Sequence, residues 1–187
     1  MKKQILVRSI AGRGPSKQRG NALVFQLLAL VIGGIAVAVG ISQYNDAERS
    51  ASIGSVVAEV AAIIGNAKAN DGQLGYVGLT TPIAVAGGTI PRIRANSTRT
   101  AASNKFSGAI TLVDNNASVV GTANLSYAGV DSDQCKEIVM GTQSLARQIQ
   151  VNGTDVKPLD GSIVSATLAS QCIATSTVLV SWIIGRT

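Results

Sequence analysis

The sequence contains no histidine among its 187 residues. Histidine is the commonest general base and the commonest metal ligand in proteins, so its absence removes the usual means of acid–base catalysis and of metal coordination. A Gly-rich phosphate loop followed by Lys-Ser or Lys-Thr is missing as well. We therefore expect that the protein is not an enzyme and that it holds no cofactor and no metal.

Cysteine and aromatic residues are scarce. The two cysteines, Cys135 and Cys172, are too few for a zinc site of Cys₄ type, and they are too far apart for the C-x-x-C pair of a redox enzyme. Aromatic residues make up 3% of the chain, which is otherwise rich in Ala, Gly, Ser, Thr, Val and Ile. This composition favours an exported domain of small residues with β-structure over a cofactor-dependent enzyme.

Charge is missing from one long stretch near the beginning of the chain. No charged residue lies between Arg19 and Asp46, and from Ala22 to Ile41 the only clearly polar side chain is Gln26. Twenty such residues in a helix span about 30 Å, which is the hydrocarbon thickness of a bilayer. We expect this stretch to cross a membrane.

The segment before this stretch is purely basic. It carries Lys2, Lys3, Arg8, Arg13, Lys17 and Arg19 without any acidic residue. Basic flanks stay on the cytoplasmic side, so residues 46–187 are expected on the other side of the membrane. Of the 16 basic and 10 acidic residues in the chain, these six lie in the leader, and the remainder is balanced. The basic excess therefore reflects topology, and we expect no direct binding to nucleic acid.

A basic leader that ends in Gly20 and runs directly into an apolar helix resembles the type IV prepilins. The resemblance implies that a prepilin peptidase cuts between Gly20 and Asn21 and leaves the helix attached. The family usually has Glu at the fifth mature position, where this chain has Phe25, followed by Gln26. Two alternatives remain open: a simple membrane anchor, and a signal peptide cut after Ala36-Val37-Ala38.

The glycines Gly33 and Gly34 interrupt the apolar helix, and each lowers helix propensity by about 1 kcal/mol relative to Ala. They allow either close approach of neighbouring helices or a weak point at which the helix extends. Together with Phe25 and Gln26 they are the residues we expect to set packing and registry in a filament core.

The periodicity of the remaining chain predicts further elements. One helix is expected over residues 21–70, with an apolar stripe of Ile53, Val56, Val57, Val60, Ile63 and Ile64 opposite polar residues that include Glu59. Residues 73–107 read as a loop with short helical turns, and it carries a basic run of Arg92, Arg94, Arg99 and Lys105. We expect this run to be solvated, and a contact with phosphate or a partner is the alternative. Strands are expected at 109–113, 118–127, 163–168 and 173–184. A second helix is expected at 132–150, with a capping box at its start and Asn152-Gly153 at its end.

The cysteines lie in the exported part of the chain, where thiols oxidise, and their number is even. We therefore expect a structural disulfide between Cys135 and Cys172. The order of Ser132-Asp133-Gln134-Cys135, a distant second cysteine and a β-rich end resembles the type IVb pilins. Residues 87–91 (Gly-Gly-Thr-Ile-Pro) and 104–112 resemble the thin-pilus pilins of conjugative plasmids most.

This resemblance implies an α+β fold, the α/β-roll, with a long N-terminal helix, an antiparallel sheet and one disulfide. The expected organisation is a cleaved leader over residues 1–20, a helix over 21–70 and a globular head over 71–187. It implies a pilin that polymerises with itself into a type IVb pilus, for conjugal transfer or adhesion. The implied partners are the prepilin peptidase and the assembly machinery of the bacterial inner membrane. A minor pilin or a secretion-system pseudopilin is the alternative.

Overall fold

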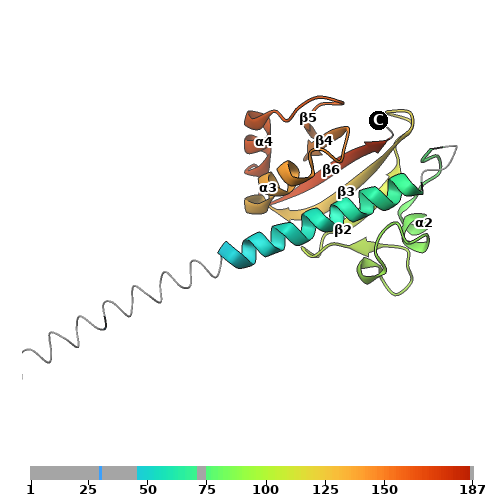
Figure 1. The fold of residues 1–187 in the computed structure, drawn as a ribbon, viewed down its shortest axis with the longest axis horizontal. Coiled ribbons are helices and arrows are strands. Elements are labelled where there is room, and N and C mark those ends of the chain that lie inside the picture. Colours follow the sequence, from blue (N-terminus) through green and yellow to red (C-terminus); the bar gives the residue numbers. More distant parts are fainter. Residues whose placement is uncertain (1–29, 31–45, 71–74, 186–187) are drawn as a thin grey trace, which may run out of the picture. The chain divides into compact units, whose positions relative to one another are not determined.

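The computed structural model describes residue 30, residues 46–70 and residues 75–185. The chain divides into two compact units, residues 1–48 and residues 49–187. The second unit holds nearly all the described residues, and the following description concerns this unit. Among the described residues its elements are a long helix, a six-stranded sheet, three shorter α-helices and one 3-10 helix (Figure 1).

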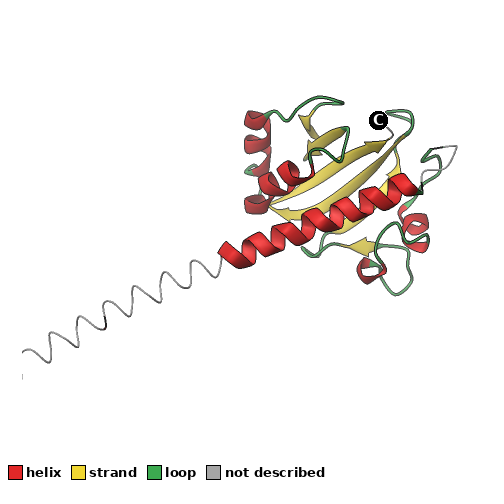
Figure 2. Ribbon diagram, in the orientation of Figure 1, coloured by secondary structure: helices red, strands yellow, loops and turns green. Residues whose placement is uncertain are grey.

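The long helix extends over Asp46–Ala69, which confirms the predicted end near residue 70. The predicted apolar stripe is also confirmed, since five of its six residues are buried and Val57 is partly buried. Buried residues recur every three or four positions and so form one face of the helix. This face packs on the sheet, which the helix crosses in Figures 1 and 2.

The described strands form one antiparallel sheet in the order β1-β2-β3-β6-β4-β5. Their bounds are β1 Ala102–Ser103, β2 Ala109–Asp114, β3 Thr122–Asp131, β4 Gln148–Val151, β5 Thr154–Lys157 and β6 Thr177–Gly185. The central pair, β3 and β6, is the longest, and Leu125 lies opposite Trp182 in its register. The strand predicted at 109–113 is confirmed. The strand predicted at 173–184 is confirmed from Thr177 onward, and the strand predicted at 118–127 begins and ends four residues later.

The two faces of the sheet differ in chemistry. Side chains on the inner face are apolar and fully buried, and they include Leu112, Leu125, Trp182 and Ile149 in one continuous row. The next residues along each strand point to the outer face, because side chains alternate along a strand. That face carries hydroxyl and amide side chains, namely Thr111, Asn124, Ser126, Ser181, Gln148 and Gln150. Ile183, which lies opposite Asn124 and Gln148, is an apolar and buried exception on this face. The long helix packs on the apolar inner face.

The short helices are α2 Thr81–Ala86, the 3-10 helix η1 Arg92–Arg94, α3 Ser132–Thr142 and α4 Ser165–Cys172. The prediction that α3 continues to Gln150 was wrong. Residues Gln148–Val151 alternate polar and apolar side chains, which is the period of a strand, and they pair with β6. The following Asn152-Gly153 has positive φ at both residues, as a two-residue hairpin turn requires, and joins β4 to β5.

The prediction of a strand at 163–168 was also wrong, because α4 occupies most of that stretch. Its Ala, Leu and Gln residues favour a helix. The buried residues Leu168 and Cys172 are four positions apart and so share one helix face. The predicted capping box at the start of α3 is absent: Asp131 makes no side-chain cap. Gln134 instead accepts a hydrogen bond from Ser52 of the long helix at 3.2 Å.

Candidate assembly surface

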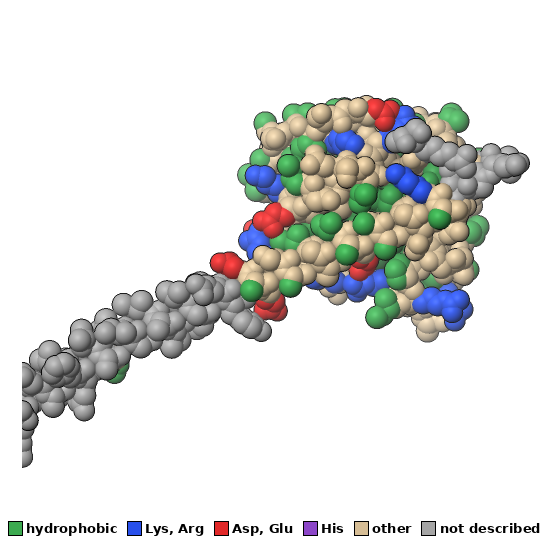
Figure 3. Space-filling view, in the orientation of Figure 1, with side chains coloured by type: hydrophobic (Ala, Val, Ile, Leu, Met, Phe, Trp, Pro, Cys, Tyr) green, Lys and Arg blue, Asp and Glu red, His purple; other side chains and the backbone are tan. Residues whose placement is uncertain are grey.

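The long helix carries a second stripe on the face that points away from the sheet. It consists only of small exposed residues, Ala51, Gly54, Ala58, Ala62, Gly65 and Ala69. At 100° per residue, these positions fall within an arc of about 80°. Figure 3 shows hydrophobic side chains along the helix on this face of the molecule. Small residues let a neighbouring helix approach closely, so this face is suited to helix packing.

The glycines of this small-residue stripe have room around them. A Cβ atom added at Gly54 or Gly65 would meet no atom within 4 Å. Nothing inside the subunit therefore requires glycine at these positions. We expected polar residues on this side of the helix and did not predict the stripe. The recurrence of Ala and Gly at three- and four-residue spacing was the signal that would have revealed it.

Among the described residues, one helix, Asp46–Ala69, is long and apolar enough to cross a membrane. Its most apolar window has a mean hydropathy of 1.4, and 33% of that window is buried within the structure. The core helix of a globular domain can have the same length and apolar content. Because Val56, Val60 and Ile63 are buried, the helix Asp46–Ala69 is part of the core of the head. The membrane segment expected at residues 22–41 lies outside the described residues, apart from Leu30.

Polar contacts hold the helix against the head at its centre. The carboxylate of Glu59 accepts a hydrogen bond from the Tyr127 hydroxyl of β3 at 2.8 Å and from Nε of Arg94 at 2.9 Å. The side chains of Glu59 and Arg94 are only 12% and 28% exposed. The prediction that Glu59 lies on a polar outer face was therefore wrong, as was the prediction of a solvated Arg94. The other three residues of the basic run are exposed, as predicted.

Further contacts tie the helix down near its beginning. Arg49 donates to the backbone carbonyl of Asp133 and lies 3.6 Å from the carboxylate of Glu137. Lys105 donates to the hydroxyl of Ser52 at 2.5 Å and to that of Ser55 at 3.3 Å. None of these contacts involves a residue of the small-residue stripe, so they leave it uncovered.

The predicted disulfide is confirmed. Cys135 and Cys172 are bonded, with their Cα atoms 5.6 Å apart, within the usual range for a disulfide. The bond joins the first turn of α3 to the last residue of α4, and both cysteines are buried. It therefore crosslinks the two helices that cover one end of the sheet.

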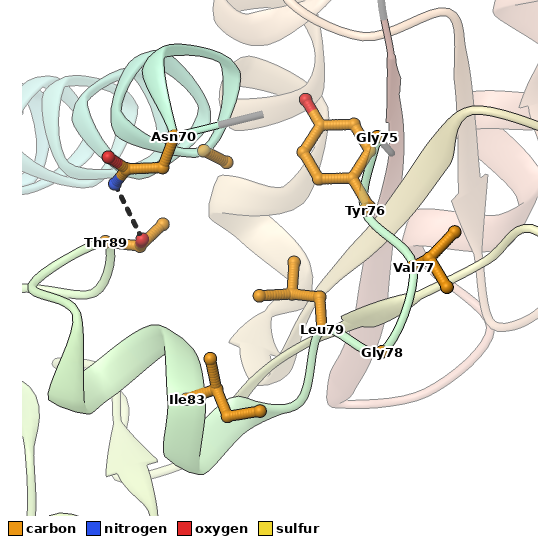
Figure 4. A pocket seen from close by; sticks show the side chains of 9 residues that line it. Asn70, Gly75, Tyr76, Val77, Gly78, Leu79, Ile83 and Thr89 are labelled. Carbon is orange, nitrogen blue, oxygen red and sulfur yellow. Dashed lines mark hydrogen bonds between the residues drawn. The ribbon is translucent and has the colours of Figure 1, made fainter. Parts of the chain in front are cut away.

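A hollow of about 250 Å³ lies beside the end of the long helix (Figure 4). Asn70 closes one side by donating to the hydroxyl of Thr89 at 3.1 Å, and the apolar side chains of Leu79 and Ile83 line another. No carboxylate, ammonium or guanidinium lines it among the described residues. The described part of the chain also has no group of three His, Cys, Asp or Glu residues placed to hold a metal ion.

The other residues singled out from the sequence are Gly20, Asn21, Phe25, Gln26, Gly33 and Gly34. All six lie outside the described residues, so their predicted roles in cleavage and registry stay predictions.

Comparison with known proteins agrees with this architecture. No curated protein matches the chain. The family described as PilS N terminal matches residues 50–184, well over half of the 187 residues. The matched region contains most of the long helix, the sheet except for its last residue, and the disulfide. The chain belongs to the PilS family, a type IVb pilin family of thin pili.

Proposed function

We propose that this pilin polymerises into a filament in which the small-residue stripe of one subunit packs against the helix of the next. The observation that carries this proposal is that Asp46–Ala69 has two opposite faces. One is buried in its own head, and the other is exposed and made only of Ala and Gly. A face of that kind admits a second helix at close range.

Paired substitutions test this packing. Gly65→Ala and Gly65→Leu both fit the isolated subunit, because the space around Gly65 is open. Both also raise helix propensity relative to Gly. We expect Gly65→Ala to form filaments in normal amounts and Gly65→Leu to lose them, at equal membrane levels of the subunit. A normal filament yield from the double variant Gly54→Leu/Gly65→Leu would contradict the proposed packing.

We propose that the chain is made as an inner-membrane precursor and processed before assembly. A prepilin peptidase cuts between Gly20 and Asn21, and the assembly machinery then extracts the mature subunit into an extracellular pilus. The basic leader abutting an apolar stretch supports this order of events. Mass spectrometry of the mature N-terminus decides the matter. A chain that starts at Asn21 supports the proposal, whereas a start near Val39 or an intact Met1 overturns it.

We propose two alternatives for registry in the filament core. The usual Glu of the family is replaced by Phe25, so either the Gln26 carbonyl accepts from the Asn21 ammonium of a neighbour or Phe25 fills an apolar pocket between helices. Filament yields of Gln26→Leu and Phe25→Ala distinguish these. Loss only in Gln26→Leu supports the hydrogen bond, and loss only in Phe25→Ala supports packing. Normal assembly of both variants would favour a minor subunit carried by another pilin.

The resemblance to thin-pilus pilins favours conjugal transfer over adhesion as the task of the filament. Deletion of the coding sequence should then abolish plasmid transfer in liquid mating while surface attachment is unchanged. A loss of attachment with normal transfer would reverse this assignment. The structural role proposed for the filament includes no catalytic step.

A further inference from the structure

A second hollow, of about 230 Å³, lies where three parts of the head meet. The end of the long helix contributes Lys68, and the segment after α3 contributes Arg147. The last residue of β5 contributes Lys157, and the segment that follows contributes Asp160. Three cationic side chains and one carboxylate therefore share one small concave space. The sequence did not indicate that these residues form one site, because they are spread over 93 positions.

The carboxylate is already committed to one of the cations. Asp160 accepts from Nε of Arg147 at 2.9 Å and from Nη2 at 2.5 Å, which is a bidentate pair. This pairing holds the pKa of Asp160 below its ordinary value. Neither Lys68 nor Lys157 forms an ion pair with a carboxylate among the described residues. The hollow is thus lined by two uncompensated ammonium groups.

Backbone carbonyls occupy only part of the hydrogen-bonding capacity of these ammonium groups. Lys68 donates to the Leu145 carbonyl at 3.1 Å, and Lys157 donates to the carbonyls of Gln143 and Ala146. Each ammonium has three N–H donors. Within the described part of the chain, three of the six donors are therefore bonded, and the remainder are open to a ligand.

Hydrogen bonds to the carbonyls of residues 143–146 would need only one lysine here, but two lysines line the same hollow. Partial burial lowers the pKa of Lys157, and the positive charge of Lys68 adds to that effect against the opposing charge of Asp160. Two like charges that line one small hollow repel each other. An anion between them would relieve that repulsion and use the open donors.

We propose that this hollow binds a phosphate-class oxyanion. A phosphate dianion matches the two uncompensated positive charges, and its several oxygens accept from donors on different sides at once. The open N–H groups of Arg147, which bonds Asp160 through only two of its five donors among the described contacts, supply a further side. The proposal does not depend on filament assembly, because every group that it uses belongs to one subunit.

Phosphate titration of the full chain in micelles of an uncharged detergent tests the site. Backbone amide NMR signals of residues 144–147 are followed at constant ionic strength, with chloride as the comparison anion. We expect a saturable shift with inorganic phosphate and none with chloride. Lys68→Gln and Lys157→Gln should each weaken binding by about tenfold or more, as expected for a hydrogen bond to a charged group. The exposed control Lys136→Gln should leave it unchanged.

Asp160→Asn provides a test that loss of folding cannot imitate. It removes the only carboxylate lining the described hollow, so phosphate should bind several-fold more tightly. Unchanged or weaker binding in Asp160→Asn, shifts that grow linearly without saturation, or equal shifts with chloride would each overturn the proposal. A comparison with glycerol 3-phosphate identifies the source. Tighter binding of the ester indicates a phosphorylated headgroup, and equal binding indicates free phosphate.

Discussion

Glu59 joins three separate segments of the chain through one carboxylate. It lies on the long helix, and its partners Tyr127 and Arg94 belong to β3 and η1. We expect Glu59→Gln to lower the free energy of unfolding by about 1–3 kcal/mol, because the half-buried guanidinium loses its counter-charge. Urea denaturation of the chain in detergent micelles measures this change.

The matched control is Glu137→Gln, which removes a carboxylate whose side chain is 55% exposed and 3.6 Å from Arg49. Exposed pairs contribute little, so its effect should stay below about 1 kcal/mol. If Glu59→Gln and Glu137→Gln lowered the free energy of unfolding equally, the burial of Glu59 would add nothing to the stability that its ion pair provides. A double-mutant cycle with Tyr127→Phe should also be non-additive, since the two side chains share a hydrogen bond.

Gly108 allows a close approach between two backbone segments. A Cβ atom at this position would lie 1.8 Å from the carbonyl oxygen of Ala128, at the irregularity in β3 between Tyr127 and Val130. We expect Gly108→Ala to lower the free energy of unfolding by more than about 3 kcal/mol, because a backbone atom cannot move aside without disturbing the sheet. Gly65→Ala is the control and should raise stability by up to about 1 kcal/mol. A neutral effect of Gly108→Ala in urea denaturation would refute the steric argument.

At the scale of elements, the disulfide is the covalent tie between α3 and α4. The cysteines are 37 positions apart, and closing a loop of that length stabilises the fold by about 4 kcal/mol in the chain-entropy model. Replacing both Cys135 and Cys172 with Ala should therefore lower the urea midpoint and reduce pilus yield. Reduction of the unaltered protein with a thiol should give a similar midpoint. A double variant as stable as the oxidised protein would show that packing alone holds the two helices.

The sheet and the long helix differ in how far the rest of the head covers them. The inner face of the sheet is apolar and buried under the long helix and α3, where Trp182 donates to Thr142 at 2.8 Å. The long helix has a second face of small residues that its own head does not cover. One element therefore stabilises the subunit and presents a packing surface, which is what a filament of subunits requires.

At the scale of the whole molecule, alkaline pH should unfold the head through Tyr127. Burial, reinforced by the negative charge of Glu59, raises the pKa of Tyr127 well above its ordinary value. The folded protein thus binds this proton more tightly than the unfolded chain, for which the pKa is about 10. The contribution of protonated Tyr127 to the free energy of unfolding is therefore complete below a pH of about 10. Above that pH the free energy of unfolding falls by about 1.4 kcal/mol per pH unit.

Urea denaturation at pH 8 to 12 measures this slope. Tyr127→Phe should be less stable than the unaltered protein at pH 8, because it lacks the hydrogen bond to Glu59, but its stability should fall less steeply above pH of about 10. Parallel curves for the two proteins would assign alkaline unfolding to other groups.

Patterns within short stretches were sufficient to predict much of this protein. Spacing of three and four placed Ile53, Val60 and Ile63 on one buried helix face, and β-prone residues predicted β2 and most of β6. The even cysteine count and the exported location predicted the disulfide between Cys135 and Cys172. These features depend on residues close in sequence, or on the compartment, so they can be inferred without knowing what packs against what.

The tertiary structure alone decided what depends on distant partners. Residues 148–151 form a strand because β6 lies beside them, although the preceding residues favour a helix. Glu59 is half-buried because Tyr127 and Arg94 meet it from segments 68 and 35 positions away. Lys68 and Lys157 share a hollow for the same reason. A local sequence pattern determines which side of a helix or strand is apolar. Which charged side chains meet depends on the chain topology, because these residues come from segments that are far apart in the sequence.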